Sequence, residues 1–327
     1  MNQRMGERQR WAWLVGGLSA AVGICACGLG WIWVVAGGLL AGLYYVYVDQ
    51  VLPTAGLAAM LPKGLTLLTL LWLIVAMAWS ANLADSAFPM INGFPVLGWT
   101  VLALAAWGSW KGAAACARCT GVLCLFLLIL YSIVTVFALS DVQLENLKPY
   151  GSWQNGLWTA GLFLLPAVVW YLPCSKSREK PAWIVGITLP LAAGILAAVT
   201  SGVLSPLLAA SLPSPLYTLT QSVSLFGVVE RIEPLLSAAM TMGVFCLLSA
   251  MACAGKALLE RIYPQKWGGI AVCAAAGVLM GAAAKVDIFV VTVGNLAVFW
   301  AVPLVYLMLR KKTSKKRKKP VDNGSQS

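Results

Sequence analysis

The sequence predicts an all-α integral membrane protein, and three observations support this fold class. Hydrophobic residues make up 60% of the 327 residues, the mean hydropathy is +0.83, and basic residues concentrate on alternate connecting segments. A hydrocarbon core of about 30 Å needs about 20 apolar residues in helical form. Because lipid offers no hydrogen bonds, each backbone amide must be satisfied within its own segment.

Hydropathy, with ends placed at charges, prolines and interfacial aromatic residues, predicts ten membrane-spanning segments in two halves. The ten-helix domain covers residues 11–309, between a cytoplasmic N-terminus of residues 1–10 and a basic cytoplasmic tail of residues 310–327. Its halves cover about 11–139 and 155–309. The predicted spans are 11–29, 30–48, 64–85, 96–110 and 117–139, followed by 155–172, 182–204, 230–256, 267–284 and 287–309.

The orientation follows from the basic residues, which cytoplasmic loops retain during insertion. Of the 23 Lys and Arg residues, all but Lys148, Arg231 and Lys285 fall on one set of segment ends. We therefore expect both termini in the cytoplasm, which agrees with an even number of crossings.

The composition also argues against several classes of function. The net charge of +12 is concentrated in the tail RKKTSKKRKKP, which suits anionic membrane lipid rather than nucleic acid. Cys116 and Cys119 form a CxxC motif, but the chain contains no histidine and no second CxxC, so we expect no metal, cofactor or redox site. No pair of carboxylates lies in mid-membrane on one helix face, and we expect no enzymatic activity. No cleavable signal peptide is expected.

The two predicted halves have the same layout, which favours a five-plus-five inverted repeat. In such transporters the first helix of each half is interrupted by Gly or Pro beside the binding site. Here the first span contains Gly16 and Gly17, and the sixth contains Gly161 and Pro166. The alternative is that these residues only permit close helix packing.

Two external segments, 140–154 and 205–229, are too long to be simple turns. The second is rich in Ser, Thr and Pro and carries no charge. We expect it to lie on the protein or dip into a vestibule, as a lid over an outward-facing cavity.

A charged cluster opens the eighth span. Glu230, Arg231 and Glu233 either cap and position that helix through its dipole, or form an outer gate or subunit contact. Asp49, Asp85 and Asp287 lie at the ends of spans, where carboxylates can reach water, and we expect them to be ordinary interfacial charges. The sequence indicates no relay of carboxylates in mid-membrane.

The stretch LPSPLYTLTQSVSLFGVVERIEPLLSAAMTMGVF, residues 212–245, resembles the B subunit of bacterial spore germinant receptors, the GerAB-type proteins. The family's Glu-Arg-(Ile/Leu)-(Glu/Asp) signature opens its eighth helix, and here it matches residues 230–233. The layout of ten spans, with a polar segment before the sixth and a basic tail, is similar over nearly the whole chain.

The resemblance implies a LeuT-like fold of the amino acid, polyamine and organocation superfamily, with a pocket between spans one, three, six and eight. It implies sensing of a small nutrient, typically an amino acid, with A- and C-type partner subunits in the inner membrane of a spore. By position, the residues expected to line the pocket are Gly16, Gly17, Ala20, Trp79, Asn82, Gly161, Pro166 and Thr241.

This sequence departs from the family at the sixth span. Where the family commonly carries a polar element, this chain reads Leu-Leu-Pro-Ala-Val at residues 164–168, so a small apolar ligand or a degenerate pocket is an alternative. Two other functions stay open: a secondary transporter of amino acids, and a structural partner without a ligand.

Overall fold

The computed structural model describes residues 5–24, 28–51, 54–86, 96–175, 182–212, 214–222 and 233–306. The side chain of Glu233 lies outside this description, as do Glu230, Arg231 and the basic tail, so the predictions for the charged cluster are not tested.

The described residues are almost entirely helical. The elements, in chain order, are β1 (Met5–Gly6), α1 (Glu7–Ile24), α2 (Trp31–Val51), α3 (Lys63–Ser86), α4 (Val96–Lys111), α5 (Ala113–Ala138), η2 (Leu139–Asp141), η3 (Leu144–Leu147), α6 (Trp153–Phe163), η4 (Leu165–Tyr171), β2 (Cys174–Ser175), α7 (Ala182–Leu204), α8 (Pro206–Ser211), α9 (Pro215–Ser222), α10 (Glu233–Ile262), α11 (Gly268–Ala283), α12 (Ile288–Asn295) and η5 (Leu296–Ala301).

Within the described residues, six helical segments are long and apolar enough to cross a membrane: α2, α3, α5, α7, α10 and the continuous segment Ile288–Tyr306. The chain is therefore a helical membrane protein. The other predicted spans correspond to α1, which begins with three charged residues at Glu7, Arg8 and Arg10, to the short α4 and α11, and to the interrupted α6. The total of ten crossings stays a prediction.

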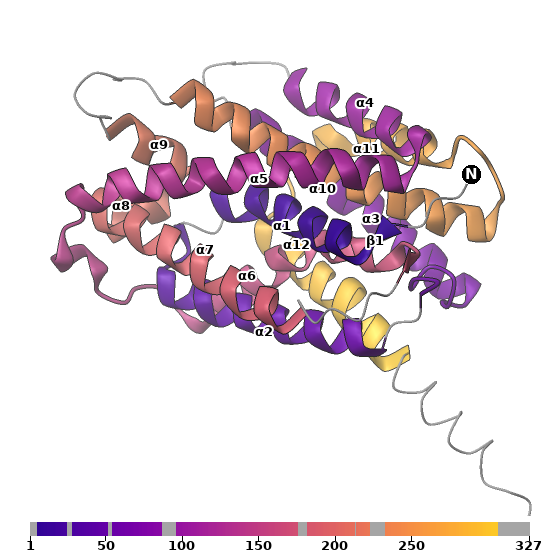
Figure 1. Cartoon of the computed structure of the whole chain (residues 1–327), viewed down its shortest axis with the longest axis horizontal. Helices are drawn as coiled ribbons and strands as arrows, with labels where there is room; N and C mark the ends of the chain where they lie inside the picture. Colours follow the sequence, from indigo (N-terminus) through magenta and orange to yellow (C-terminus); the bar gives the residue numbers. More distant parts are fainter. Residues whose placement is uncertain are drawn as a thin grey trace, which may run out of the picture.

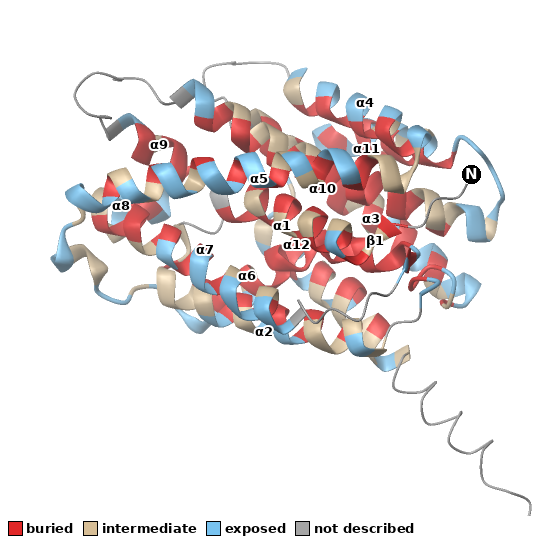
Figure 2. Cartoon of the chain, viewed as in Figure 1, coloured by how far each residue is buried: buried red, intermediate tan, exposed pale blue. Residues whose placement is uncertain are grey.

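The helices form one bundle in which α10 is central (Figure 1). It contacts α1, α3, α4, α5 and α11. In its most apolar 18-residue stretch 72% of the sequence is buried, compared with 28% in the corresponding stretch of the segment that includes α5. Figure 2 shows this contrast between the mostly buried α10 and the exposed outer face of α5. That face carries Val122 and Leu125, which are 72% and 63% exposed. Large apolar side chains on an outer face are expected where lipid is the solvent.

The α2–α7 contact is the most extensive between two helices of the described residues, and small residues permit their close approach. A Cβ placed on Gly42 would overlap the Gly186 carbonyl of α7, and one placed on Gly37 would overlap the Gly156 carbonyl of α6. In lipid, helices associate through van der Waals packing rather than the hydrophobic effect, so small residues that let backbones touch are stabilising.

The segment after α7 is not an extended loop. It forms α8 and α9, and Leu216 and Leu219 of α9 are fully buried. The prediction that this segment lies on the protein is confirmed for α9, whereas Leu207 of α8 is 87% exposed. The expected role of the segment as a lid stays a prediction. The earlier polar segment folds against the end of α7, where the Gln143 N–H and the Asn146 side-chain amide both donate to the Gly202 carbonyl.

Two of the carboxylates at span ends accept hydrogen bonds from helix starts, although Asp85 Oδ2 is buried without a hydrogen-bond partner among the described residues, instead of reaching water as predicted. Asp287 is the N-cap of α12 and accepts a hydrogen bond from the Phe289 N–H at 3.1 Å. Asp85 accepts a longer bond, 3.4 Å, from the Gly98 N–H in the first turn of α4. Both satisfy N–H groups that a helix start leaves unpaired.

Candidate functional site

The sixth apolar segment is interrupted where the sequence predicted. The α-helical part ends at Phe163, and the chain continues as the 3₁₀ helix η4 from Leu165. Pro166 has no N–H to donate to the Leu162 carbonyl, which destabilises the α-helical pattern at this position, although α7 continues through Pro190. The Ala167 N–H donates instead to the Leu164 carbonyl at 3.0 Å. This shift leaves the Phe163 carbonyl without its helical donor.

Buried side chains from two other helices donate to the carbonyls at this break, and a partly buried tryptophan from a third helix supports one of them. The Asn295 side-chain amide donates to the Gly161 carbonyl at 3.1 Å, and its oxygen accepts from Trp72 Nε1 at 3.0 Å. The Tyr45 hydroxyl donates to the Phe163 carbonyl. We call this set, formed by Gly161, Phe163, Asn295, Trp72 and Tyr45, the helix-6 centre.

A second irregular turn lies next to the helix-6 centre. Asn295 ends α12, and the following π-helical turn, η5, places the Phe299 carbonyl so that it accepts from the Tyr44 hydroxyl at 2.6 Å. Asn295 and Thr292 are both fully buried, and the Thr292 hydroxyl has no hydrogen-bond partner among the described residues. Isolated π-helical turns within helices are frequent at functional sites.

Two of the predicted pocket residues meet at this break. A Cβ on Gly17 of α1 would lie 3.0 Å from Pro166 Cβ and 3.5 Å from Leu247 Cα of α10. Gly17 is therefore enclosed between η4 and α10, with no room for a ligand in this conformation. The predicted open cavity at Gly17 is wrong for this state.

The predicted interruption of the first helix is also wrong. α1 continues without a break from Glu7 to Ile24, through Gly16, Gly17 and Ala20. Gly16 lies against Thr120 and Cys246, because a Cβ at this position would be 3.2 Å from the nearest side-chain atom of each. Ala20 is fully buried beside Gly243. Gly17 and Ala20 serve close helix packing, which was the alternative interpretation, while Gly16 also lines a cavity between α1, α5 and α7.

The remaining predicted pocket residues do not converge on the break, except Gly161. Gly161 packs against Thr292, and its carbonyl belongs to the helix-6 centre. Asn82 donates instead to the Met280 carbonyl of α11 at 3.2 Å, and Trp79 is partly buried against the core of the bundle. Thr241 lines a separate cavity between α4, α5 and α10. In this structure Asn82 and Thr241 do not share a pocket with Gly17, because their helix faces point to other neighbours.

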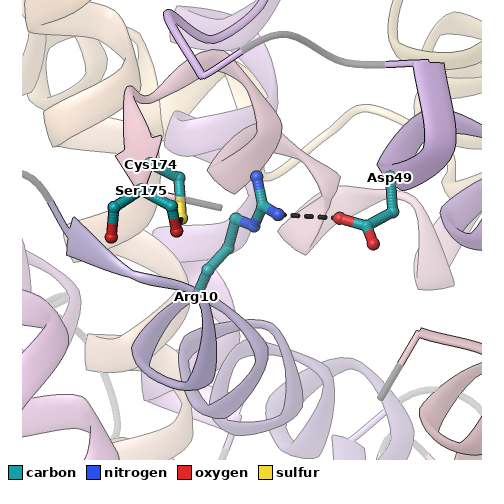
Figure 3. A network of polar contacts seen from close by, with 4 residues as sticks. All are labelled: Arg10, Asp49, Cys174 and Ser175. Atoms are coloured by element: carbon teal, nitrogen blue, oxygen red, sulfur yellow. Dashed lines mark hydrogen bonds and ion pairs between the residues drawn. The ribbon is translucent and has the colours of Figure 1, made fainter. Parts of the chain in front are cut away.

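A buried ion pair, which sequence reasoning missed, lies at the start of α1 (Figure 3). The Arg10 guanidinium is 2.7 Å from Asp49 Oδ1, and the two side chains are 4% and 15% exposed. Arg10 also lies over the Trp170 ring, 4.0 Å from its centroid, and Trp11 packs edge-on against the same ring. Burial lowers the pKa of Arg10 from its ordinary value, while Cys174, Asp49 and Glu7 act in the opposite direction.

Three segments meet beside this ion pair at one end of the bundle: the start of the chain, the α2–α3 connection and the residues after η4. Met5 and Gly6 pair in parallel with Cys174 and Ser175, just after η4. The α2–α3 connection joins them, because the Cys174 N–H donates to the Thr54 carbonyl at 3.0 Å. The prediction that Asp49 is an ordinary interfacial charge is wrong. The sequence did contain a signal for this ion pair, because Arg10 and Asp49 carry opposite charges at the same end of two consecutive apolar segments.

Two cavities open between helices away from the helix-6 centre. One, of about 290 Å³, lies between α1, α5 and α7. The other, of about 410 Å³, lies between α4, α5 and α10.

Comparison of this sequence with protein-family models and with curated proteins found no match.

Proposed function

We propose that this chain is the membrane subunit of a spore germinant receptor of the B type, which senses a small nutrient such as an amino acid. The observation that carries the proposal is the helix-6 centre. There an interrupted helix presents backbone carbonyls to buried polar side chains, and its break packs directly against α1. In transporter-like folds, such interrupted helices form the binding site near mid-membrane.

The contacts between helices support a five-plus-five inverted repeat. If the halves begin at α1 and at α6, the corresponding elements are α1 with α6–η4, α2 with α7, α3 with α10, and α4 with α11. Each of these four pairs is in contact, whereas the fifth pair of such a repeat, α5 with α12, shares no extensive contact in the described part of the chain. Two copies of a unit related by a twofold axis contact each other through equivalent surfaces, so this pattern is what ten spans in two related halves would produce.

In this proposal, hydrogen bonds to the ligand replace the hydrogen bonds that Asn295 and Tyr45 make to the Gly161 and Phe163 carbonyls. The Gly161 and Phe163 carbonyls can accept from an ammonium group, and the Asn295 amide and Tyr45 hydroxyl can donate to a carboxylate. These groups compensate for the apolar sequence of residues 164–168. Binding requires α1 to move away from Pro166, which provides a second arrangement of the bundle. A ligand that prefers this open arrangement shifts the population toward it.

The signal then passes to A- and C-type partner subunits in the inner membrane of the spore, with both termini cytoplasmic and the basic tail on anionic lipid. Adjacent genes for A- and C-type subunits would support this assignment.

Ligand-dependent thermal stabilisation of the purified chain, measured against a panel of L-amino acids, tests the proposal. We expect one or a few ligands to raise the midpoint, and we expect Asn295→Ala to abolish the increase. Asn155→Ala is the matched control, because Asn155 also donates from its side chain to one carbonyl, that of Leu29, but away from the break. A response that survives Asn295→Ala and is lost in Asn155→Ala would contradict the assignment of the site.

A secondary transporter of amino acids is the second candidate, since the same break could hold Na⁺ through backbone carbonyls. Counterflow in proteoliposomes separates the two functions. Saturable exchange of the stabilising ligand favours transport, and stabilisation without exchange favours a sensor. The absence of both would favour a structural subunit with a closed, unused pocket.

A further inference from the structure

The cavity between α4, α5 and α10 has apolar walls and a single charged side chain. Its walls include Leu104 and Trp107 of α4, Ala115 of α5, and Met242 and Phe245 of α10. Lys111, the last residue of α4, is the one charged residue among its described lining residues. We call this cavity the α4–α10 groove. It opens on the outer surface of the bundle, where Leu104 and Trp107 are 49% and 59% exposed.

The walls of the groove offer little to a polar ligand. The Thr241 hydroxyl donates to the Ser237 carbonyl of its own helix at 2.9 Å, so this hydroxyl is not available to donate a hydrogen bond to a ligand. Desolvating a nutrient's charged groups against such walls would be costly without compensating bonds. The α4–α10 groove therefore suits an alkyl chain, and it is distinct from the helix-6 centre.

At the C-terminal end of α4, tryptophan and lysine side chains lie beside the groove. Lys111 Nζ lies 5.6 Å and 5.7 Å from the ring centroids of Trp107 and Trp110, and Trp110 stacks on Trp267 with 5.8 Å between centroids. Lys256 is close by, since its Nζ donates to the Ser109 carbonyl at 3.4 Å. Among the described residues no carboxylate forms an ion pair with Lys111. Tryptophan and lysine together are typical of the level of the lipid headgroups.

We propose that the α4–α10 groove binds an anionic phospholipid, with an acyl chain between α4 and α10 and the phosphate at Lys111. The charge complementarity decides between possible occupants. An apolar helix of a partner subunit would cover the groove but leave the Lys111 ammonium against its surface without a counter-charge. A phospholipid instead matches the apolar walls and the terminal cation at the same time.

Photo-crosslinking in nanodiscs of mixed phosphatidylglycerol and phosphatidylcholine tests this proposal. The probe is phosphatidylglycerol with a diazirine in its acyl chain, and the adducts are mapped by mass spectrometry. We expect adducts concentrated on the groove walls, and about fivefold less labelling there in Lys111→Gln, the effect of one juxtamembrane basic residue. Lys63→Gln, which removes an exposed lysine at the start of α3 outside the groove, should leave the labelling unchanged.

A second pair of variants separates the groove from general lipid contact. Ala115→Phe should fill the groove and abolish labelling of Met242 and Phe245, whereas Val122→Phe on the exposed face of the same helix should not. Adducts spread evenly over all apolar outer faces, or equal labelling by a phosphatidylcholine probe, would overturn the proposal. Displacement of the lipid by a co-purified membrane helix would overturn it as well. Lys111→Gln alters only an exposed side chain, so its result stands even if Ala115→Phe does not fold.

Discussion

Removing one partner of the Arg10–Asp49 ion pair should destabilise the protein more than removing both. In Asp49→Ala, the Arg10 guanidinium stays buried beneath Trp170 without its counter-charge. Breaking a buried ion pair from one side costs about 3–5 kcal/mol. Because the Asp49 side chain is 15% exposed, we expect the lower end, about 3 kcal/mol.

The assay is thermal unfolding of the purified protein in detergent. At about 2 °C per kcal/mol for a large domain, Asp49→Ala should lower the midpoint by about 6 °C. The double variant Arg10→Met, Asp49→Ala should recover part of this loss, because the methionine can still pack on Trp170 while no charge is left buried. Asp141→Ala, at an exposed position in η2, is the control and should change stability by less than about 0.5 kcal/mol. Additive effects of the two substitutions, or an unchanged midpoint for Asp49→Ala, would refute the reasoning.

Three further substitutions test the packing of the bundle, each measured by thermal unfolding and by yield in the membrane. Gly42→Leu should abolish folding, because the new side chain would overlap the α7 backbone at Gly186; a well-folded variant would contradict the close α2–α7 contact. Gly17→Leu should be strongly destabilising, while Gly64→Leu, with nothing within 4 Å of its Cβ position, should be nearly neutral; similar losses in the two would show that Gly17 is not enclosed. Asn295→Ala removes two hydrogen bonds, and at about 0.6–1.7 kcal/mol for each such bond in a membrane protein it should cost about 1–3 kcal/mol; no loss would mean that the helix-6 centre contributes nothing to stability.

Features that depend on the chemistry of a few neighbouring residues could be predicted from the sequence. The apolar segments follow from the need to satisfy every backbone amide in lipid, and six of them are long enough helices in the structure. The break at Pro166 follows from its missing N–H. The cap at Asp287 follows from the unpaired N–H groups of a helix start.

Partners that lie far apart in the sequence could not be predicted. Glycines predicted a break in α1, but Gly16 and Gly17 are packed by α5, η4 and α10, and this packing overrides their low helix propensity. The donors to the helix-6 break come from Tyr45 and Asn295, each more than 100 residues away in the chain.

By itself, therefore, the sequence determined which segments are helical and apolar and where the sixth one is interrupted. The tertiary structure alone decided that Asp49 pairs with Arg10, that Thr241 faces the α4–α10 groove, and that Gly17 closes against Pro166. The physical reason is that hydropathy and proline chemistry act within one segment. The direction in which a polar side chain points within the bundle depends on how each helix is rotated against its neighbours, and that rotation is set by packing between distant segments.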